Sequence, residues 1–171
     1  MPFLRACVHT IDRFTDGCGR LLALLGLGMA LLTSLIVVMR YGFNVGSILA
    51  QEAVIYMHGS LFLLGAAYAL KTGAHVRVDI FYRAFGPRAQ AWVNSLGGTI
   101  FLLPLCVFIL VSSWNYVGES WAMRETSPEP GGIPAVFLLK TLIPLAAINL
   151  GLQGAAEILR NALFLVEGEK H

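Results

Sequence analysis

The feature that most constrains this chain is the length of its segments without charge. No charged residue occurs in Leu21–Met39, Ala53–Leu70 or Ala89–Gly118, and a fourth segment, Ala135–Leu159, carries only two. A helix of about 20 apolar residues can cross the ~30 Å hydrocarbon core of a bilayer. We therefore predict an all-α integral membrane protein, with residues 1–171 forming one domain of four transmembrane helices at about 21–39, 53–70, 91–116 and 135–158.

Composition supports this class and excludes others. The chain is 57% hydrophobic and 13% charged, against roughly 25% charged in soluble domains. The basic residues form no stripe interleaved with aromatic residues, which argues against nucleic-acid binding. The three cysteines have no C-x-x-C spacing, so a thiolate metal site or a disulfide relay is not expected.

The basic residues predict the orientation of the spans. Lys and Arg number three before the first span, one between spans 1 and 2, four between spans 2 and 3, one between spans 3 and 4, and two after the last. Loops rich in Lys and Arg remain in the cytoplasm. We therefore expect both termini to be cytoplasmic, and the connections between spans 1 and 2 and between spans 3 and 4 to lie outside.

Two cytoplasmic segments have amphipathic patterns. Residues 3–18 place apolar and charged side chains on opposite sides of a helix, which predicts an interfacial helix before Gly17 and Gly19 loosen the chain. Residues 71–88 can also form an apolar face, although part of this segment alternates as a strand would. We expect both segments to lie along the membrane surface.

The third span and the outer connection that follows it are unusual. Thirty uncharged residues would form a helix of about 45 Å, which must tilt, kink near Pro104 or protrude from the bilayer. The Pro- and Gly-rich segment 127–134 predicts a stiff, non-helical outer turn. Lys140 is close enough to the outer end of span 4 for its side chain to snorkel to that interface.

Small residues recur at intervals of four in two spans. Such stripes let helix backbones approach closely in a membrane, where the hydrophobic effect provides no attraction between helices. The pattern leaves open whether the stripes contact each other or a foreign helix. The predicted packing residues are Gly65, Ala69 and Gly73 in span 2, and Ala147, Gly151 and Ala155 in span 4.

One ionisable residue inside span 2 and one at its outer entrance are candidates for function. His58 could ligate haem or relay protons, but a second deep ligand is absent, so we favour a neutral imidazole hydrogen-bonded to a neighbouring helix. Glu52 could bind a coupling ion, cap the first turn of its helix or contact a partner subunit. We favour the capping and contact interpretations, because coupling carboxylates are usually buried near the midplane.

The sequence argues against an enzyme. The group His75-x-Arg77-x-Asp79 could suggest a metal or catalytic site, but an isolated triplet of this kind is weak evidence and also fits a hydrogen-bonded turn. Nothing in the sequence indicates a nucleophile with its base, a phosphate loop or a metal cluster. Without a buried carboxylate for proton exchange, transport by this chain alone is not expected. We predict no metal and no cofactor.

An ordered set of motifs resembles the small membrane subunit, the DctQ-like family, of tripartite ATP-independent periplasmic (TRAP) transporters. The resemblance covers roughly residues 52–160. The matching residues are Gln51-Glu52, Leu64-Gly65-Ala66-Ala67-Tyr68-Ala69-Leu70, Lys71 to Asp79 with His75 and Arg77, Glu125-Thr126-Ser127, Gly132-Ile133-Pro134, Lys140, Pro144 and Leu152-Gln153-Gly154.

The resemblance implies a non-catalytic subunit of a sodium-coupled importer in a bacterial inner membrane. Its partners would be a large elevator-type membrane subunit of about twelve spans and a periplasmic substrate-binding protein. Glu52, His75, Arg77 and Asp79 would then be structural or contact positions. The turn with Glu125, Ser127, Gly132 and Pro134 could dock the binding protein. The competing hypothesis is a haem- or quinone-binding membrane anchor of a respiratory oxidoreductase, which would use His58.

Overall fold

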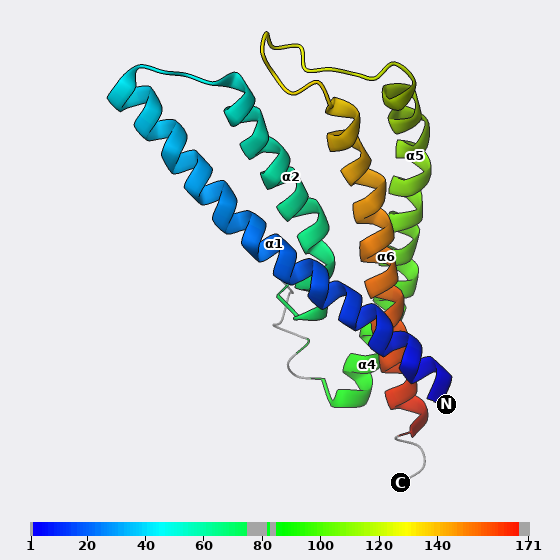
Figure 1. The fold of residues 1–171 in the computed structure, drawn as a ribbon. Helices are drawn as coiled ribbons and strands as arrows, with labels where there is room; N and C mark the ends of the chain where they lie inside the picture. Colours follow the sequence, from blue (N-terminus) through cyan, green and yellow to red (C-terminus); the bar gives the residue numbers. More distant parts are fainter. Residues whose placement is uncertain (1, 75–81, 83–84, 168–171) are drawn as a thin grey trace.

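The computed structural model describes residues 2–74, 82 and 85–167, and every regular element within them is helical. These elements are α1 (Pro2–Phe43), α2 (Ile48–Lys71), α4 (Pro87–Gly97), the π-helical turn η1 (Gly98–Leu102), α5 (Leu103–Ala122) and α6 (Val136–Glu167) (Figure 1). The all-α fold predicted from the sequence is confirmed.

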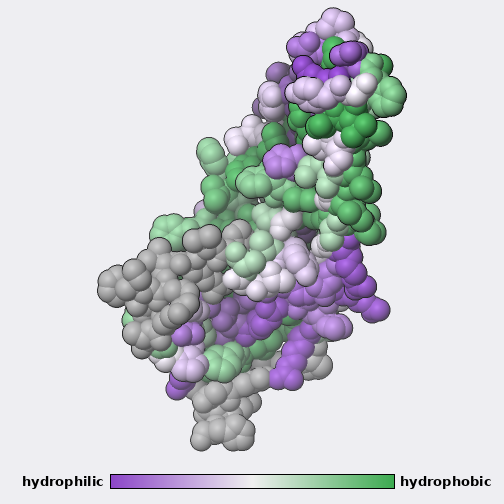
Figure 2. Space-filling model, turned by 90° about the vertical axis from the view of Figure 1, so that its left-hand side faces the viewer, coloured by the Kyte–Doolittle hydropathy of each residue, from purple (hydrophilic) through white to green (hydrophobic). Residues whose placement is uncertain are grey.

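Four helical segments are long and apolar enough to cross a membrane: Phe3–Phe43, Ile48–Lys71, Pro87–Ala122 and Val136–Val166. Each coincides with one of the four spans expected from the charge pattern and extends beyond it at one end or both. On the face shown in Figure 2, a broad apolar region lies between hydrophilic regions at the two ends of the molecule. The chain is therefore a multi-pass membrane protein.

Helix α6 lies at the centre of the bundle. It packs against α1, α2, α4 and α5, and 28% of its most apolar window is buried, against 6% in each of the other three spans. The start of α1, the end of α6 and α4 lie at one end of the bundle, which we call the terminal end. The α1–α2 and α5–α6 connections lie at the other, which we call the loop end (Figure 1).

Helix α1 differs from the sequence-based expectation. Gly17 and Gly19 do not separate an interfacial helix from the first span, because α1 continues without a break from Pro2 to Phe43. A Cβ atom at Gly19 would lie 2.4 Å from Cδ2 of Tyr68, whereas one at Gly17 would have no atom within 4 Å. Gly19 therefore makes room for the Tyr68 ring where α1 meets α2.

This contact predicts different effects for two identical substitutions. Gly19→Ala should destabilise the bundle by about 1–3 kcal/mol, the usual cost of overpacking. Gly17→Ala should be neutral or stabilising by up to about 1 kcal/mol, because alanine favours the helix. Thermal unfolding in detergent compares the two variants. A Tyr68→Leu substitution should partly rescue Gly19→Ala, and equal midpoints for both alanine variants would contradict the interpretation.

Both ends of α2 are capped by their own residues. Ser47 accepts a hydrogen bond from the Ala50 backbone N–H at 3.3 Å and caps the first turn. At the other end, Ala74 N–H donates to the Ala69 carbonyl at 2.9 Å and Gly73 has φ 68°, the geometry of a Schellman motif. Gly73 thus lies beyond the helix end, not on the helical face shared by Gly65 and Ala69.

The third span is irregular close to its proline. Leu103 N–H donates to the carbonyl of Gly98, five residues earlier, which closes the wide turn η1. Pro104 follows at the start of α5; it has no N–H to donate to the carbonyl four residues before it. The irregularity expected near Pro104 is therefore a π-helical turn directly before it.

Candidate functional site

Glu52 ties the loop between α5 and α6 to the start of α2. Its Oε1 accepts a short hydrogen bond from the Ser127 hydroxyl, and its Oε2 accepts one from the Ile133 backbone N–H at 2.6 Å. Glu52 lies in the second turn of α2, and the cap of that helix is Ser47. Its carboxylate therefore holds the loop. The interpretation that Glu52 caps the first turn of its own helix is wrong, because Ser47 is the cap.

Gly132 completes this contact because it has no side chain. A Cβ atom at this position would lie 2.6 Å from Oε1 and 2.7 Å from Oε2 of Glu52, and 2.5 Å from the Ser127 hydroxyl. Neighbouring Gly131 has φ 82°, a conformation that glycine adopts without strain. The non-helical turn predicted at 127–134 is present, and its backbone path depends on these two glycines.

A second carboxylate holds the base of the same loop. Glu125 Oε2 accepts from the Lys140 ammonium at 2.5 Å and from the Ser120 hydroxyl at 2.6 Å. These hydrogen bonds, Lys140 first, hold the pKa of Glu125 below its usual value, so the carboxylate stays ionised at neutral pH. Lys140 also lies 4.1 Å from the centre of the Tyr116 ring. It is thus paired within the protein and does not simply snorkel outward.

The residues predicted to dock a partner divide into two groups. Glu125, Ser127 and Gly132 are half-buried and form the contacts that fix the loop, whereas Pro134 is exposed. The exposed tip consists of Pro128, Glu129, Pro130 and Gly131. Sequence reasoning recognised the turn and missed which residues form its surface. The composition alone does not separate the two groups.

Small residues of α2 and α6 line a common apolar groove. The groove has a volume of about 660 Å³ and lies between α2, α5 and α6, with Gly65, Ala69 and Ala147 among its lining residues. A Cβ atom at Gly65 would meet nothing within 4 Å, whereas one at Gly151 would lie 3.5 Å from Cβ of Cys106. Gly65 therefore opens onto free space, and Gly151 packs against α5. Ala155 is half-buried on α6.

Polar side chains join three helices at the terminal end. Gln153 of α6 is fully buried; it accepts from the Thr15 hydroxyl of α1 at 2.7 Å and donates to Asp12 Oδ1 at 3.2 Å. Arg160 bridges Asp12 at 2.7 Å and Glu157 at 2.5 Å. A further ion pair joins Lys71 of α2 to Asp16 of α1 at 2.5 Å. The sequence singled out Gln153 only as part of a motif.

His58 differs from its sequence interpretation. Its side chain is exposed on the surface of α2, and its ring is 6.4 Å from that of Phe62, one turn further along the same helix. Within residues 2–74, 82 and 85–167, no hydrogen bond joins His58 to a neighbouring helix. The expected interhelical hydrogen bond is therefore not made within the described part of this chain, because the imidazole is exposed on the surface of α2.

The remaining candidate residues, His75, Arg77 and Asp79, lie outside the described residues. Among the residues that are described, no group of three or more His, Cys, Asp or Glu side chains could hold a metal ion. The described candidates have structural roles instead. Glu52 and Glu125 fix the loop, and small residues line the groove.

Comparisons with known proteins agree with the resemblance seen in the sequence. The profile of the DctQ component of tripartite ATP-independent periplasmic transporters matches residues 29–164. The chain is 29% identical over 126 residues to the C4-dicarboxylate TRAP transporter small permease protein DctQ of Vibrio cholerae, which covers 70% of this chain and 54% of the relative. It is 32% identical over 112 residues to a Haemophilus influenzae protein named as a TRAP transporter small permease, covering 65% and 66%.

The chain thus spans about half the length of the first relative and about two-thirds of the second. No solved structure matches it.

Proposed function

The chain belongs to the DctQ component family of the tripartite ATP-independent periplasmic transporters, and on this premise we propose that it is the non-catalytic small membrane subunit of a sodium-coupled importer. In this proposal a large membrane subunit of about twelve spans carries the substrate and sodium. The present chain is a fixed scaffold for that subunit in the bacterial inner membrane.

The distribution of charge supports one orientation. Most basic residues that the structure describes lie near the terminal end, namely Arg5, Arg13 and Arg20 of α1, Lys71 of α2, Arg88 of α4 and Arg160 of α6, and such clusters remain cytoplasmic. We therefore place both termini in the cytoplasm. The loop end, with Glu52 and the α5–α6 loop, then faces the periplasm.

The open groove is the observation that carries the scaffold proposal. Gly65 and Ala69 line an apolar space of about 660 Å³ at the level of the membrane spans, and a side chain at Gly65 would touch nothing in this chain. Small residues at this spacing allow another helix to approach closely. A helix of the large subunit would fill the groove.

The α5–α6 loop supports a second, more specific part of the proposal. Its exposed tip, Pro128–Gly131, lies between Ser127 and Ile133, which Glu52 holds, and Glu125 with Lys140 fixes the base of the same loop. A surface fixed before binding loses less conformational entropy when a partner docks. We propose that the periplasmic substrate-binding protein contacts this tip.

The respiratory-anchor alternative is not favoured, because the family and the curated relatives are transporter subunits. A pull-down from native membranes in mild detergent separates the two hypotheses. A large permease subunit in the eluate would support the scaffold proposal. A flavoprotein or an iron–sulfur protein would replace it with the respiratory anchor.

Gly65→Leu tests the scaffold contact directly. The leucine should fill the groove without disturbing this chain, so membrane insertion should be normal while recovery of the large subunit falls about tenfold. Gly118→Leu is the matched control, since a Cβ atom there also meets nothing within 4 Å and Gly118 is not among the lining residues of the groove. Unchanged recovery with Gly65→Leu would refute this placement of the interface.

A further inference from the structure

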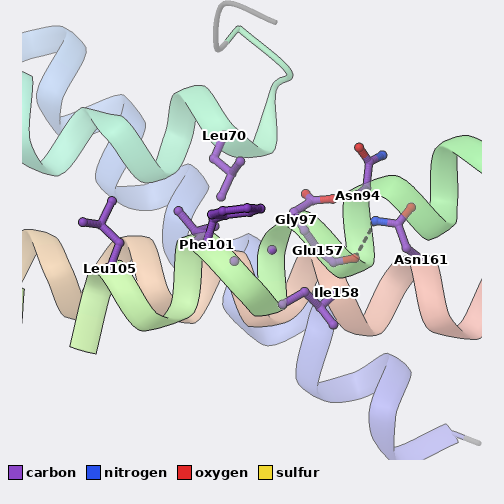
Figure 3. A pocket seen from close by; sticks show the side chains of 11 residues that line it. Leu70, Asn94, Gly97, Phe101, Leu105, Glu157, Ile158 and Asn161 are labelled. Carbon is purple, nitrogen blue, oxygen red and sulfur yellow. Dashed lines mark hydrogen bonds between the residues drawn. The ribbon is translucent and has the colours of Figure 1, made fainter. Parts of the chain in front are cut away.

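A second cavity, unrelated to the groove, lies at the terminal end of the bundle. It has a volume of about 340 Å³ and lies between the end of α2, the α4–η1–α5 segment and α6 (Figure 3). This volume is within the roughly 300–1,000 Å³ range of small-molecule sites. The cavity is distinct from the loop and groove used in the proposed function.

One end of the cavity offers hydrogen-bond acceptors. Asn94, Asn161 and Glu157 line this end, as Figure 3 shows. The Asn94 amide donates to the Tyr82 hydroxyl at 2.8 Å, and the Asn161 amide donates to the backbone carbonyl of Glu157 at 2.8 Å. Within the part of the chain that the structure describes, no donor reaches Oδ1 of either asparagine or Oε2 of Glu157.

Glu157 brings a carboxylate to this end of the cavity and shares its cation with Asp12. Glu157 Oε1 accepts from Arg160 at 2.5 Å, but the same guanidinium also binds Asp12 at 2.7 Å. One cation is thus shared between two carboxylates. A ligand that brings a positive charge and N–H donors would complement this end of the cavity.

The other end is apolar and points toward the middle of the bundle. Leu70, Phe101 and Leu105 line it (Figure 3). The lining changes from polar near the terminal end, at Asn161 of α6 and Asn94 of α4, to apolar toward the membrane interior, at Leu105 of α5. A ligand matching both ends would be amphipathic, with its polar head at the membrane surface.

From this arrangement we propose that the cavity binds a phospholipid whose headgroup carries a primary ammonium, as in phosphatidylethanolamine. The ammonium donates to Glu157 and to the carboxamide oxygens of Asn94 and Asn161. The first part of an acyl chain lies along Phe101 and Leu105. The bound lipid lies against both α6 and the irregular turn η1.

Native mass spectrometry of the full-length chain in detergent tests the proposal with three lipids of identical acyl chains. Phosphatidylethanolamine offers a charged N–H donor, phosphatidylcholine a quaternary cation without N–H, and phosphatidylglycerol an anionic headgroup. We expect one tightly retained phosphatidylethanolamine, about tenfold preferred over phosphatidylcholine and more over phosphatidylglycerol. Retention that does not depend on the headgroup, or that favours phosphatidylglycerol, would overturn the proposal.

Two variants locate the site. Gly97 lines the cavity, and a Cβ atom there would meet nothing within 4 Å, so Gly97→Leu should block the cavity and lower retention about tenfold. Gly118→Leu, which is remote from the cavity, should retain the lipid. Glu157→Gln keeps the shape of the site and should abolish the preference for phosphatidylethanolamine over phosphatidylglycerol. Normal binding in both Gly97→Leu and Glu157→Gln would refute this location.

Discussion

Glu52→Gln is expected to release the α5–α6 loop from α2 while leaving the helices in place. The carboxylate accepts from both Ser127 and the Ile133 N–H, but a carboxamide is uncharged and has only one acceptor oxygen, so both contacts lose the charge that strengthens them. A hydrogen bond to a charged group contributes about 1.5–3 kcal/mol. The amide of Ile133 should therefore exchange about ten- to a hundredfold faster with deuterium, measured by hydrogen exchange in detergent.

Two further variants make the test specific. Glu129→Gln is the same change at an exposed position of the same loop, and it should leave exchange at Ile133 unaltered. Gly132→Ala should reproduce the Glu52→Gln result from the other partner, because its Cβ atom would lie 2.6 Å from Glu52 Oε1. If Glu52→Gln and Glu129→Gln behave alike, the carboxylate does not hold the loop. If the tip docks the binding protein, Glu52→Gln should also weaken that docking.

The helices could be predicted from the sequence because their cause is local. Long charge-free segments dictate membrane-spanning helices whatever their neighbours are, and all four spans are present. The irregularity before Pro104 also has a local cause, namely the missing N–H of proline. In both cases the relevant interaction lies within about one helical turn of the residue that determines it.

Contacts between distant residues could not be predicted in the same way. Gly19 was interpreted as loosening the chain, because a glycine pattern does not reveal that the Tyr68 ring lies against it. Glu52 was recognised as a structural or contact position, yet its partners, Ser127 and Ile133, are 75 and 81 residues away. The ion pair between Glu125 and Lys140 is likewise set by the path of a loop, for which periodicity offers no signal.

The hydrogen-bond network around Gln153 predicts the second large effect. Gln153→Leu removes the acceptor of the Thr15 hydroxyl, which is 1% exposed, and one donor to Asp12. Leaving such groups unpaired away from water costs about 2–4 kcal/mol, or about 5–10 °C in the unfolding midpoint of a chain of this size. Thermal unfolding in detergent measures the shift. Gln51→Leu, the same change at an exposed site on α2, should stay within about 0.5 kcal/mol of the wild type.

A double-mutant cycle then isolates the buried hydrogen bond. Thr15→Val alone leaves Oε1 of Gln153 without its donor at a position that is 0% exposed. Removing both partners leaves neither the hydroxyl nor the amide oxygen unpaired, so Thr15→Val combined with Gln153→Leu should cost less than the sum of the single changes. Strict additivity would show that the two residues are not coupled. A positive coupling would establish that Gln153 fixes the N-terminal half of α1 against α6, at the end where Arg160 and Lys71 also hold α1.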